Sequence, residues 1–325
     1  MAQSGKLKDK LRLLSQIISA PLTPTAESEI AKALESKQNL LVAKAAKAVQ
    51  MHELTAHTPQ LIAAFERFLI EGEKTDKLCH AKTAITTALD ELNCVDCGIF
   101  LKGIHCRQYE PSWGGSTDTA GELRAISATA LAGSGYAGIY YELTDLLYDS
   151  EPRARSGAAR ALAFMGTESS ELILRARILA GELVEDVVGT CFSALMGINP
   201  HQSFDFVARY LEDKNPAIAE EAAFALGESR VAPALDALRN VYAHTFNTEW
   251  KRTLLIAVAL IRTDEALGFL IDAVANEEVA SAHHALEALS SYGHDEKLVE
   301  RLQVVVAQRG DEAIRSRFYA VFARS

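Results

Sequence analysis

Residues 152–166 read PRARSGAARALAFMG, and residues 216–227 read PAIAEEAAFALG. Counted from each proline, alanines stand at the sixth, seventh and ninth positions and leucine at the tenth. Proline suits the first turn of a helix and glycine the position just past its end. Each stretch therefore predicts one helix, which begins at Pro152 or Pro216 and ends at Gly166 or Gly227. The small alanine side chains let such helices approach neighbours closely, while the leucine fills the space between layers.

Pairs of a small and a large residue like Ala161-Leu162 recur along the whole chain. They are Ala48-Val49, Ala88-Leu89, Ala130-Leu131, Ala161-Leu162, Ala194-Leu195, Ala225-Leu226, Ala259-Leu260, Ala288-Leu289 and Ala320-Val321. A shorter amphipathic helix precedes each of these stretches, as residues 141–148 illustrate. Because one helix pair cannot bury its apolar face alone, such repeats stack into a continuous core. The sequence predicts an all-α solenoid, or superhelix, of about nine helix pairs.

The repeat resembles the HEAT-repeat superfamily, especially the short bacterial form found in phycobilin lyases. The family fingerprint is a turn Asp-Pro, an arginine three residues after the proline, and alanine-rich positions ending in Ala-Leu-Gly. Arg155 has this place after Pro152, and Arg124 has the same offset before Ala130-Leu131, whereas Ala219 replaces the arginine after Pro216. The resemblance covers residues 25–325. It implies the fold and says little about chemistry, because such solenoids serve unrelated functions.

The two ends of the chain differ in their predicted roles. Residues 1–24 are predicted to form a capping helix and a linker, with Leu7, Leu11, Leu14 and Ile18 on one stripe of a helix over 6–20. Such a helix either covers the first repeat or docks a partner. Residues 25–325 are predicted to form a single solenoid, with a loop insertion at about 105–119 between helices at 97–104 and 120–132.

The insertion carries a second, narrower resemblance. The residues Glu110, Pro111, Trp113, Gly114, Gly115, Asp118, Thr119, Ala120 and Arg124 follow the signature of an uncharacterised bacterial HEAT-like family. Members of that family are often encoded beside spike and tip proteins of type VI secretion systems. The resemblance implies an accessory that binds secretion cargo.

The tryptophan and the charged residues of the insertion have alternative roles. Trp113 is expected either to wedge between repeats or to offer an exposed aromatic anchor. Gly114 and Gly115 permit a turn, and Asp118 or Thr117 can cap the helix that follows. Arg124 would tie the loop down through Glu110 or Asp118, or present its charge to a ligand. A composition with tryptophan and tyrosine predicts an ordered loop that folds back on neighbouring repeats.

Two motifs resemble known ligand-binding motifs, but their context or spacing does not support such sites. Residues 133–138 match the dinucleotide-binding spacing GxGxxG, but they follow a helix end where that motif needs a strand. Cys94, Cys97, His105 and Cys106 could supply four zinc ligands, although their spacing is not that of a zinc finger and adjacent His105 and Cys106 would have difficulty reaching one ion. The alternative is that Cys97 is a small core residue. We predict no metal, no cofactor and no catalytic residues.

The outward positions of the second helices predict a mixed binding groove. They contribute basic side chains early in the chain, acidic ones in the middle and apolar ones later, including Arg153, Arg160, Glu220, Glu221, Leu254 and Leu255. A mixed groove suits a protein or peptide partner, whose own charges would set the register.

Composition restricts the class of partner and the compartment. The 325 residues carry 33 basic and 43 acidic side chains, a formal charge of −10, which argues against nucleic acid and anionic membrane as partners. Five cysteines and no signal-like start predict a reducing cytoplasm. The function predicted is a non-catalytic scaffold or adaptor for a protein or peptide. The alternatives are a chromophore-handling protein like the phycobilin lyases and a DNA-binding or repair protein of the HEAT-like type.

Overall fold

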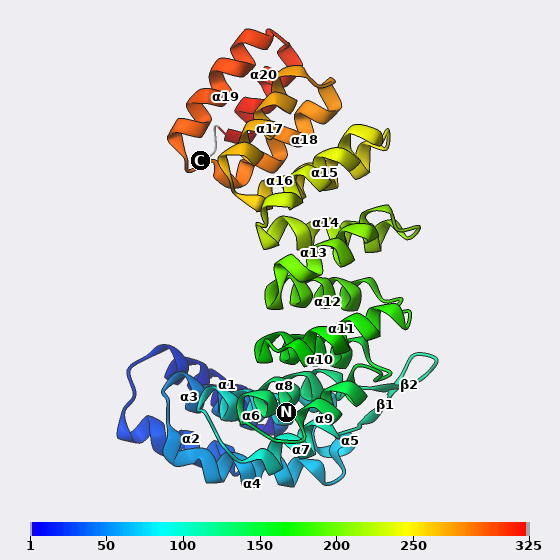
Figure 1. Ribbon diagram of the computed structural model, residues 1–325. Helices are drawn as coiled ribbons and strands as arrows, with labels where there is room; N and C mark the ends of the chain where they lie inside the picture. The colour runs from blue at the N-terminus through cyan, green and yellow to red at the C-terminus, as the bar shows by residue number, and fades with distance from the viewer. Residues whose placement is uncertain (1, 323–325) are drawn as a thin grey trace. The chain divides into compact units, whose positions relative to one another are not determined.

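Twenty α-helices and one two-stranded hairpin make up the computed structural model, which describes residues 2–322 (Figure 1). The chain divides into two compact units, one up to residue 173 and one from residue 174. The helices of the first unit are α1 (Ala2–Ser19), α2 (Pro24–Leu34), α3 (Asn39–Met51), α4 (Thr58–Leu69), α5 (Gly72–Thr75), α6 (His80–Glu91), α7 (Cys97–Ile104), α8 (Gly121–Gly133), α9 (Ile139–Leu146) and α10 (Pro152–Met165). Short 3-10 turns lie at Thr55–His57 and Lys77–Cys79.

Helix α11 (Glu168–Leu179) crosses from the first unit into the second. The second unit continues with α12 (Glu185–Ile198), α13 (Pro200–Ala208), α14 (Pro216–Ser229), α15 (Ala232–His244), α16 (Thr248–Ile261), α17 (Asp264–Asn276), α18 (Val279–Leu289), α19 (Glu296–Arg309) and α20 (Glu312–Phe322). Its 3-10 turns are Arg209–Glu212 and Ser290–Tyr292.

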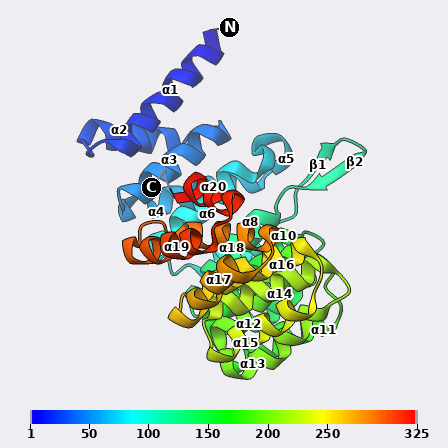
Figure 2. The same cartoon turned by 90° about the horizontal axis from the view of Figure 1, so that it is seen from above.

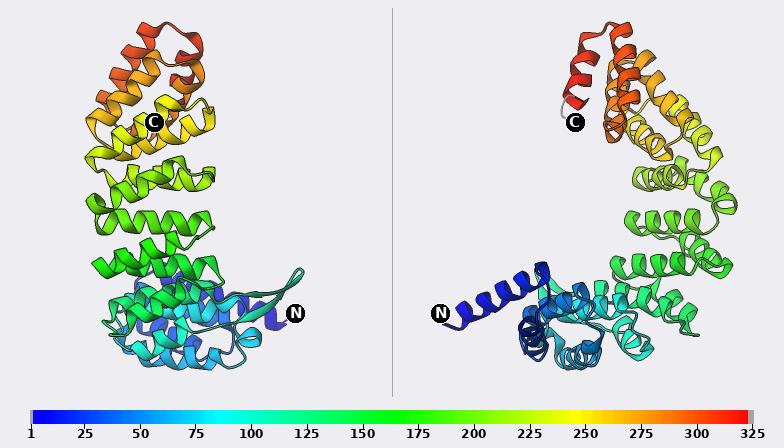
Figure 3. Two further views of the ribbon diagram at one scale, coloured as in Figure 1. Left: turned by 45° about the vertical axis from the view of Figure 1, so that its right-hand side comes forward. Right: turned by 90° about the vertical axis from the view of Figure 1, so that its left-hand side faces the viewer.

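The helices pack as pairs in chain order, which confirms the predicted all-α repeat fold. In the first unit α2 packs on α3, α4 on α6, α7 on α8 and α9 on α10, and the second helices α3, α6, α8 and α10 stack successively. In the second unit α13 packs on α14, α15 on α16, α17 on α18 and α19 on α20, while α12, α14, α16, α18 and α20 stack in the same way. Figure 3 shows these layers within each unit. Each predicted small–large pair lies in a second helix, and Ala161-Leu162 and Ala225-Leu226 are buried.

The local signals predict the helix end correctly in the repeat of α10 and incorrectly in that of α14. Helix α10 begins at Pro152 and is closed by Gly166 in the left-handed conformation, as predicted. Helix α14 begins at Pro216, but Gly227 lies inside it and Arg230 takes the left-handed position. The prediction that Gly227 ends this helix is wrong, because Gly227 faces α16, where a Cβ would overlap the carbonyl oxygen of Ala257.

The insertion is a β-hairpin where a loop was predicted. Strands β1 (Tyr109–Ser112) and β2 (Gly115–Asp118) pair antiparallel, with Tyr109 opposite Asp118 and Ser112 opposite Gly115. Figure 2 shows the hairpin projecting beyond the helices of its own unit. These strands could not be predicted, because the segments YEPS and GSTD contain one aromatic and one β-branched residue and no apolar alternation.

The N-terminal helix is longer than predicted and packs on α3. Leu14 and Ile17 of α1 are buried, whereas Leu13 stays half exposed. The boundary predicted at residue 24 and the single solenoid predicted after it stay predictions. Along residues 2–322, none of the helices has both the length and the apolar content that crossing a bilayer requires.

Candidate partner-binding site

The hairpin turn presents Trp113 to solvent. Residues 113 and 114 form the turn between β1 and β2, and Gly114 has φ +90°, a left-handed conformation that favours glycine. The Trp113 side chain has a relative exposure of 105%, the highest among the exposed large apolar residues. The wedge interpretation is therefore wrong, and the interpretation of Trp113 as a partner-binding anchor stays a prediction. Most exposed single apolar residues need no explanation, but a tryptophan placed at the tip of a supported hairpin is a candidate contact.

Glu110 fixes the base of the hairpin. Its Oε1 accepts hydrogen bonds from the backbone N–H of Leu78 at 2.6 Å, from Gln108 Nε2 at 2.7 Å and from the Thr119 hydroxyl at 2.8 Å. Burial by itself would raise the pKa of Glu110, but these hydrogen bonds and the nearby charge of Lys77 lower it below its ordinary value. The carboxylate is therefore held charged in its buried position, and the hairpin is held against the repeat before it.

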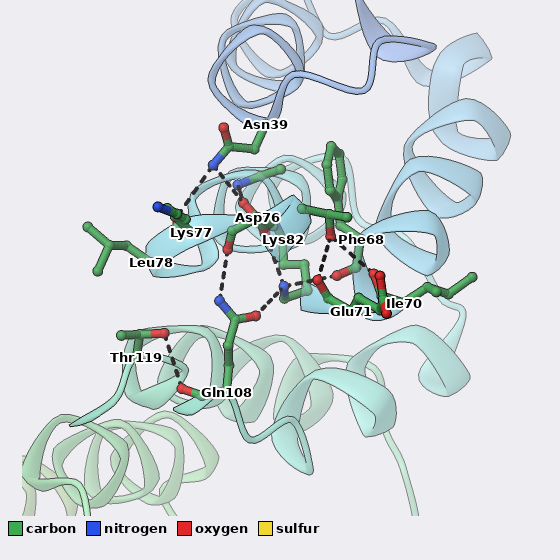
Figure 4. A network of polar contacts seen from close by, with 12 residues as sticks. Asn39, Phe68, Ile70, Glu71, Asp76, Lys77, Leu78, Lys82, Gln108 and Thr119 are labelled. Atoms are coloured by element: carbon green, nitrogen blue, oxygen red, sulfur yellow. Dashed lines mark hydrogen bonds and ion pairs between the residues drawn. The ribbon is translucent and has the colours of Figure 1, made fainter. Parts of the chain in front are cut away.

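A buried lysine lies beneath this base (Figure 4). Lys82 Nζ donates to Gln108 Oε1 at 2.8 Å and to the Phe68 carbonyl at 3.1 Å, and it pairs with Asp76 Oδ2 at 3.1 Å. Both side chains of the Lys82–Asp76 pair are buried. All three protons of the ammonium group thus have a partner, as a buried charge requires.

Asp76 and Gln108 connect this network to the surrounding elements. Asp76 accepts from the N–H groups of Ala81 and Lys82 at the start of α6 and from Asn39 Nδ2 at the start of α3. Gln108 Nε2 donates to the Asp76 carbonyl at 2.8 Å. The network therefore joins the two preceding repeats, through α3 and α6, to the segment that leads into β1.

A second buried network holds the other strand. Arg124 has no exposed side-chain surface, and its guanidinium pairs with Asp118 at 2.8 Å and with Asp149 at 2.8 Å. It also donates to the Cys106 carbonyl at 2.8 Å, and Asp149 receives a further ion pair from Arg107 at 2.8 Å. Arg124 ties the insertion down through Asp118, which was one of the two roles predicted for it. Its burial excludes the other role, in which it presents charge to a ligand.

A groove lies along the second helices beside the hairpin. It has a volume of about 690 Å3 and is lined by residues of α3, α6, α8, β2 and the start of α10, including Leu40, Leu78, His80 and Arg153. A second hollow of about 510 Å3 continues from it, shares Leu40 and His80, and adds Lys37, Lys74 and Lys77. Leu40 and Leu78 are 46% and 56% exposed, so the floor offers apolar contact. We call the combined hollow the basic groove, after Lys37, Lys74, Lys77, His80 and Arg153.

The structure separates the residues predicted for the binding surface. Arg153 lines the basic groove, whereas Arg160 is exposed further along α10 and does not line it. Glu220 and Glu221 lie on α14 in the second unit. Leu254 and Leu255 on α16 are completely buried, so the prediction that they face outward is wrong. These helix positions face the neighbouring second helix in the stack, where aliphatic side chains form core.

The proposed zinc ligands do not gather around one point. Cys97 Sγ lies 3.3 Å from the Ser134 hydroxyl, and His105 pairs with Glu142 at 3.0 Å. Across residues 2–322 no group of three or more His, Cys, Asp and Glu side chains is placed to hold a metal ion. Cys106 instead lies beside Cys79, whose hydrogen bond lowers the pKa of Cys106 to about 7, against the opposing effect of burial and with help from the charges of Lys82 and Arg124.

Four buried residues of the two networks were not predicted from the sequence. Asp76, Lys82, Gln108 and Asp149 are all buried. One signal was available: Lys82 and Thr86 lie four residues apart on the same buried face of α6 as Ile85 and Leu89. A lysine on an apolar stripe needs an acidic partner from elsewhere in the chain. The partner itself could not be read from spacing.

Replacing Glu110 with glutamine is expected to lower stability in a pH-dependent way. Hydrogen bonds to a charged acceptor contribute more than those to a neutral one, so we expect a loss of about 1 kcal/mol at neutral pH. Because the folded-state pKa of Glu110 is lowered, this contribution is complete above the ordinary glutamate pKa of 4.5 and is lost as the pH falls through the folded value. The measurement is urea unfolding of wild type and Glu110→Gln at several pH values. A difference that stays constant down to pH 3 would contradict the assignment, and Glu73→Gln, at an exposed glutamate, is the control.

Comparison with known proteins gives structural likenesses without a sequence family. No known family model matches the chain, and no curated protein matches it in sequence. The chain is similar to the complex of CpcE and CpcF of phycocyanin lyase from Nostoc sp. PCC7120, with 18% identity, 92% of this chain and 96% of that chain covered, and a TM-score of 0.36. It is also similar to an engineered protein (17% identity, 96% and 93% covered, TM-score 0.37) and to human deoxyhypusine hydroxylase in complex with glycerol (16% identity, 84% and 99% covered, TM-score 0.29).

Proposed function

We propose that the protein is a non-catalytic binding scaffold that holds an extended acidic segment of a protein partner in the basic groove. The observation that carries the proposal is the fully exposed Trp113 on a hairpin whose two strands are each fixed by a buried charge network. Tryptophan supplies a large contact area at low entropic cost, and interface energy concentrates in such anchors. A hairpin with a fixed base positions this anchor before binding, which reduces the cost of ordering.

The charges of the basic groove favour a polypeptide over a nucleic acid. Lys37, Lys77 and Arg153 attract carboxylates, and the exposed parts of Leu40 and Leu78 offer apolar contacts between them. Glu122 and Glu151 line the same groove and would repel a continuous row of phosphates. A peptide with spaced acidic and apolar side chains matches this mixture. The accessory role in type VI secretion rests on the sequence resemblance alone and stays a prediction.

Selection from a displayed random peptide library is expected to return acidic peptides whose binding depends on Trp113. Truncating a central aromatic anchor costs about 2 kcal/mol, so Trp113→Ala should weaken binding by about 30-fold. The measurement is a calorimetric titration of one selected peptide into wild type, Trp113→Ala and Tyr141→Ala, which removes another strongly exposed aromatic side chain of the first unit. Equal affinity of wild type and Trp113→Ala, or enrichment of basic peptides alone, would overturn the proposal.

A further inference from the structure

The second unit contains an aromatic groove that the proposed function does not use. It has a volume of about 620 Å3 and is formed by the turn before α14, the first turns of α14 and α16, and the end of α15 with its following loop. Leu211, Ala219 and Val241 contribute apolar side chains to its lining, and Phe246 and Trp250 contribute aromatic rings. We call this hollow the aromatic groove.

The loop that carries Phe246 is fixed at both ends. The Thr245 N–H donates to the Val241 carbonyl at 3.1 Å and so ends α15, while Asn247 Oδ1 accepts from the Trp250 N–H at 3.1 Å and so caps α16. Phe246 lies between these two residues and has a relative exposure of 97%. The exposure of this large apolar ring therefore follows from a structured loop.

The rim of the aromatic groove is negatively charged. Glu212, Asp213, Glu220 and Glu249 contribute carboxylates, and His244 is the one basic side chain among the residues that line it. Glu220 also belongs to a row of acidic residues along α12 and α14. Burial, together with repulsion from Asp186, Glu220 and other nearby carboxylates, raises the pKa of Glu221 in this row. The folded unit thus carries like charges close together, and a cationic partner would relieve their repulsion.

We propose that the aromatic groove binds a basic segment of a polypeptide, with an arginine side chain against Phe246 and Trp250 and its charge balanced by Glu212 and Glu220. Aromatic faces attract guanidinium groups, and carboxylates accept their fork of N–H donors. This pairing of rings with carboxylates fits a cation on an apolar stem, whereas the same carboxylates would repel phosphates and acidic peptides. The site is separate from the basic groove in residues and in the charge it selects, so it goes beyond the proposed function.

The two tryptophans of the chain make the test selective, because one lies in each candidate site. In Trp113→Phe the fluorescence reports Trp250 alone, and in Trp250→Phe it reports Trp113 alone. A capped peptide of alternating arginine and alanine is titrated into both proteins. We expect a saturable change in Trp250 emission and no saturable change in Trp113 emission. A peptide of alternating glutamate and alanine should leave the Trp250 emission unchanged.

Matched charge variants distinguish binding in the aromatic groove from nonspecific attraction of a basic peptide to a negatively charged protein. In the Trp113→Phe background, Glu212→Gln with Glu220→Gln is expected to weaken the arginine peptide by about tenfold. Asp272→Asn with Glu300→Gln removes the same charge from exposed positions on α17 and α19, and it should change the affinity less than about threefold, as screened charges do. Phe246→Ala should weaken binding by about tenfold without affecting folding, because the ring is exposed.

The proposal is overturned if saturating arginine peptide leaves the Trp250 emission unchanged, or if the two charge variants lose equal affinity. Loss of Trp113-dependent peptide binding with retained Trp250 binding would contradict the proposed function and leave this site standing. The opposite pattern would remove this site and leave the proposed function intact.

Discussion

Replacing Arg124 with methionine is expected to lower the free energy of unfolding by about 3–5 kcal/mol. The guanidinium lies between the carboxylates of Asp118 and Asp149, at 2.8 Å from each, and none of its side chain is exposed. Methionine fills much of the volume but leaves two buried carboxylates close together without their shared counter-charge. Removing one partner of a buried ion pair is strongly destabilising because the other charge stays buried without compensation. Replacing the whole ion pair by apolar side chains, in contrast, is often neutral. Guanidinium unfolding of the two proteins measures the difference.

Two further variants make this expectation specific to the buried charges. Arg160→Met removes the same side chain from an exposed position on α10 and should change the free energy of unfolding by less than about 0.5 kcal/mol. Adding Asp118→Asn to Arg124→Met should recover part of the loss, since Asp149 keeps its ion pair with Arg107 and the substitution removes the charge that Arg124 had balanced. If the double variant is less stable than Arg124→Met by the full cost of Asp118→Asn alone, the two residues are not coupled and the interpretation fails.

The same replacement connects stability to the proposed function. Arg124 holds β2 through Asp118, whereas Glu110 and Lys82 hold the β1 side. Weakening one side should let the hairpin tip move while the helices stay folded. In the Trp250→Phe background, the anisotropy of Trp113 emission should therefore fall when Arg124 is replaced under conditions where the protein remains folded. Unchanged anisotropy would mean that β2 does not depend on this ion pair.

The repeat could be predicted from sequence because its signals are local. Proline, alanine spacing and the small–large pairs each act within one helix, and they located the second helices of both units. The hairpin could not be predicted in this way, because its strands lack apolar alternation. Its stability comes from contacts to Leu78, Lys82 and Asp149, which are distant from it in the chain.

The exposure predicted for Leu254 and Leu255 was wrong because equivalent helix positions do not have the same environment in every repeat. The residues five and four positions before the alanine of each small–large pair are Ser156 and Gly157 in α10, Glu220 and Glu221 in α14, and Leu254 and Leu255 in α16. Gly157 and Glu221 face the seams between stacked second helices. The short and aliphatic side chains are buried there, while the glutamates reach out, and Glu221 covers Gly189 of α12. Side-chain size and polarity therefore decide exposure at these positions, and periodicity alone does not.

The seam itself gives the second large expected effect, for Gly157→Ala. Alanine inside a helix is ordinarily more favourable than glycine by about 1 kcal/mol. At Gly157, however, a Cβ would overlap the Cα and Cβ of Ala125 on α8, and neither α8 nor α10 can move without disturbing its neighbours. Overpacking costs about 1–3 kcal/mol, and an overlap this close belongs at the upper end of that range. After the gain of about 1 kcal/mol in helix preference is subtracted, the variant should be less stable than wild type by about 2 kcal/mol.

A matched glycine distinguishes packing from helix propensity. Gly268 lies inside α17 with open space around the position of a Cβ, so Gly268→Ala should raise the free energy of unfolding by about 0.5–1 kcal/mol. The two substitutions are chemically identical and should change stability in opposite directions. Adding Ala125→Gly to Gly157→Ala removes one of the two overlapping groups and should recover part of the loss. If Gly157→Ala stabilises the protein as Gly268→Ala does, then α8 and α10 do not approach as closely as described, and the alanine-lined seam on which the stacking of second helices depends would need another explanation.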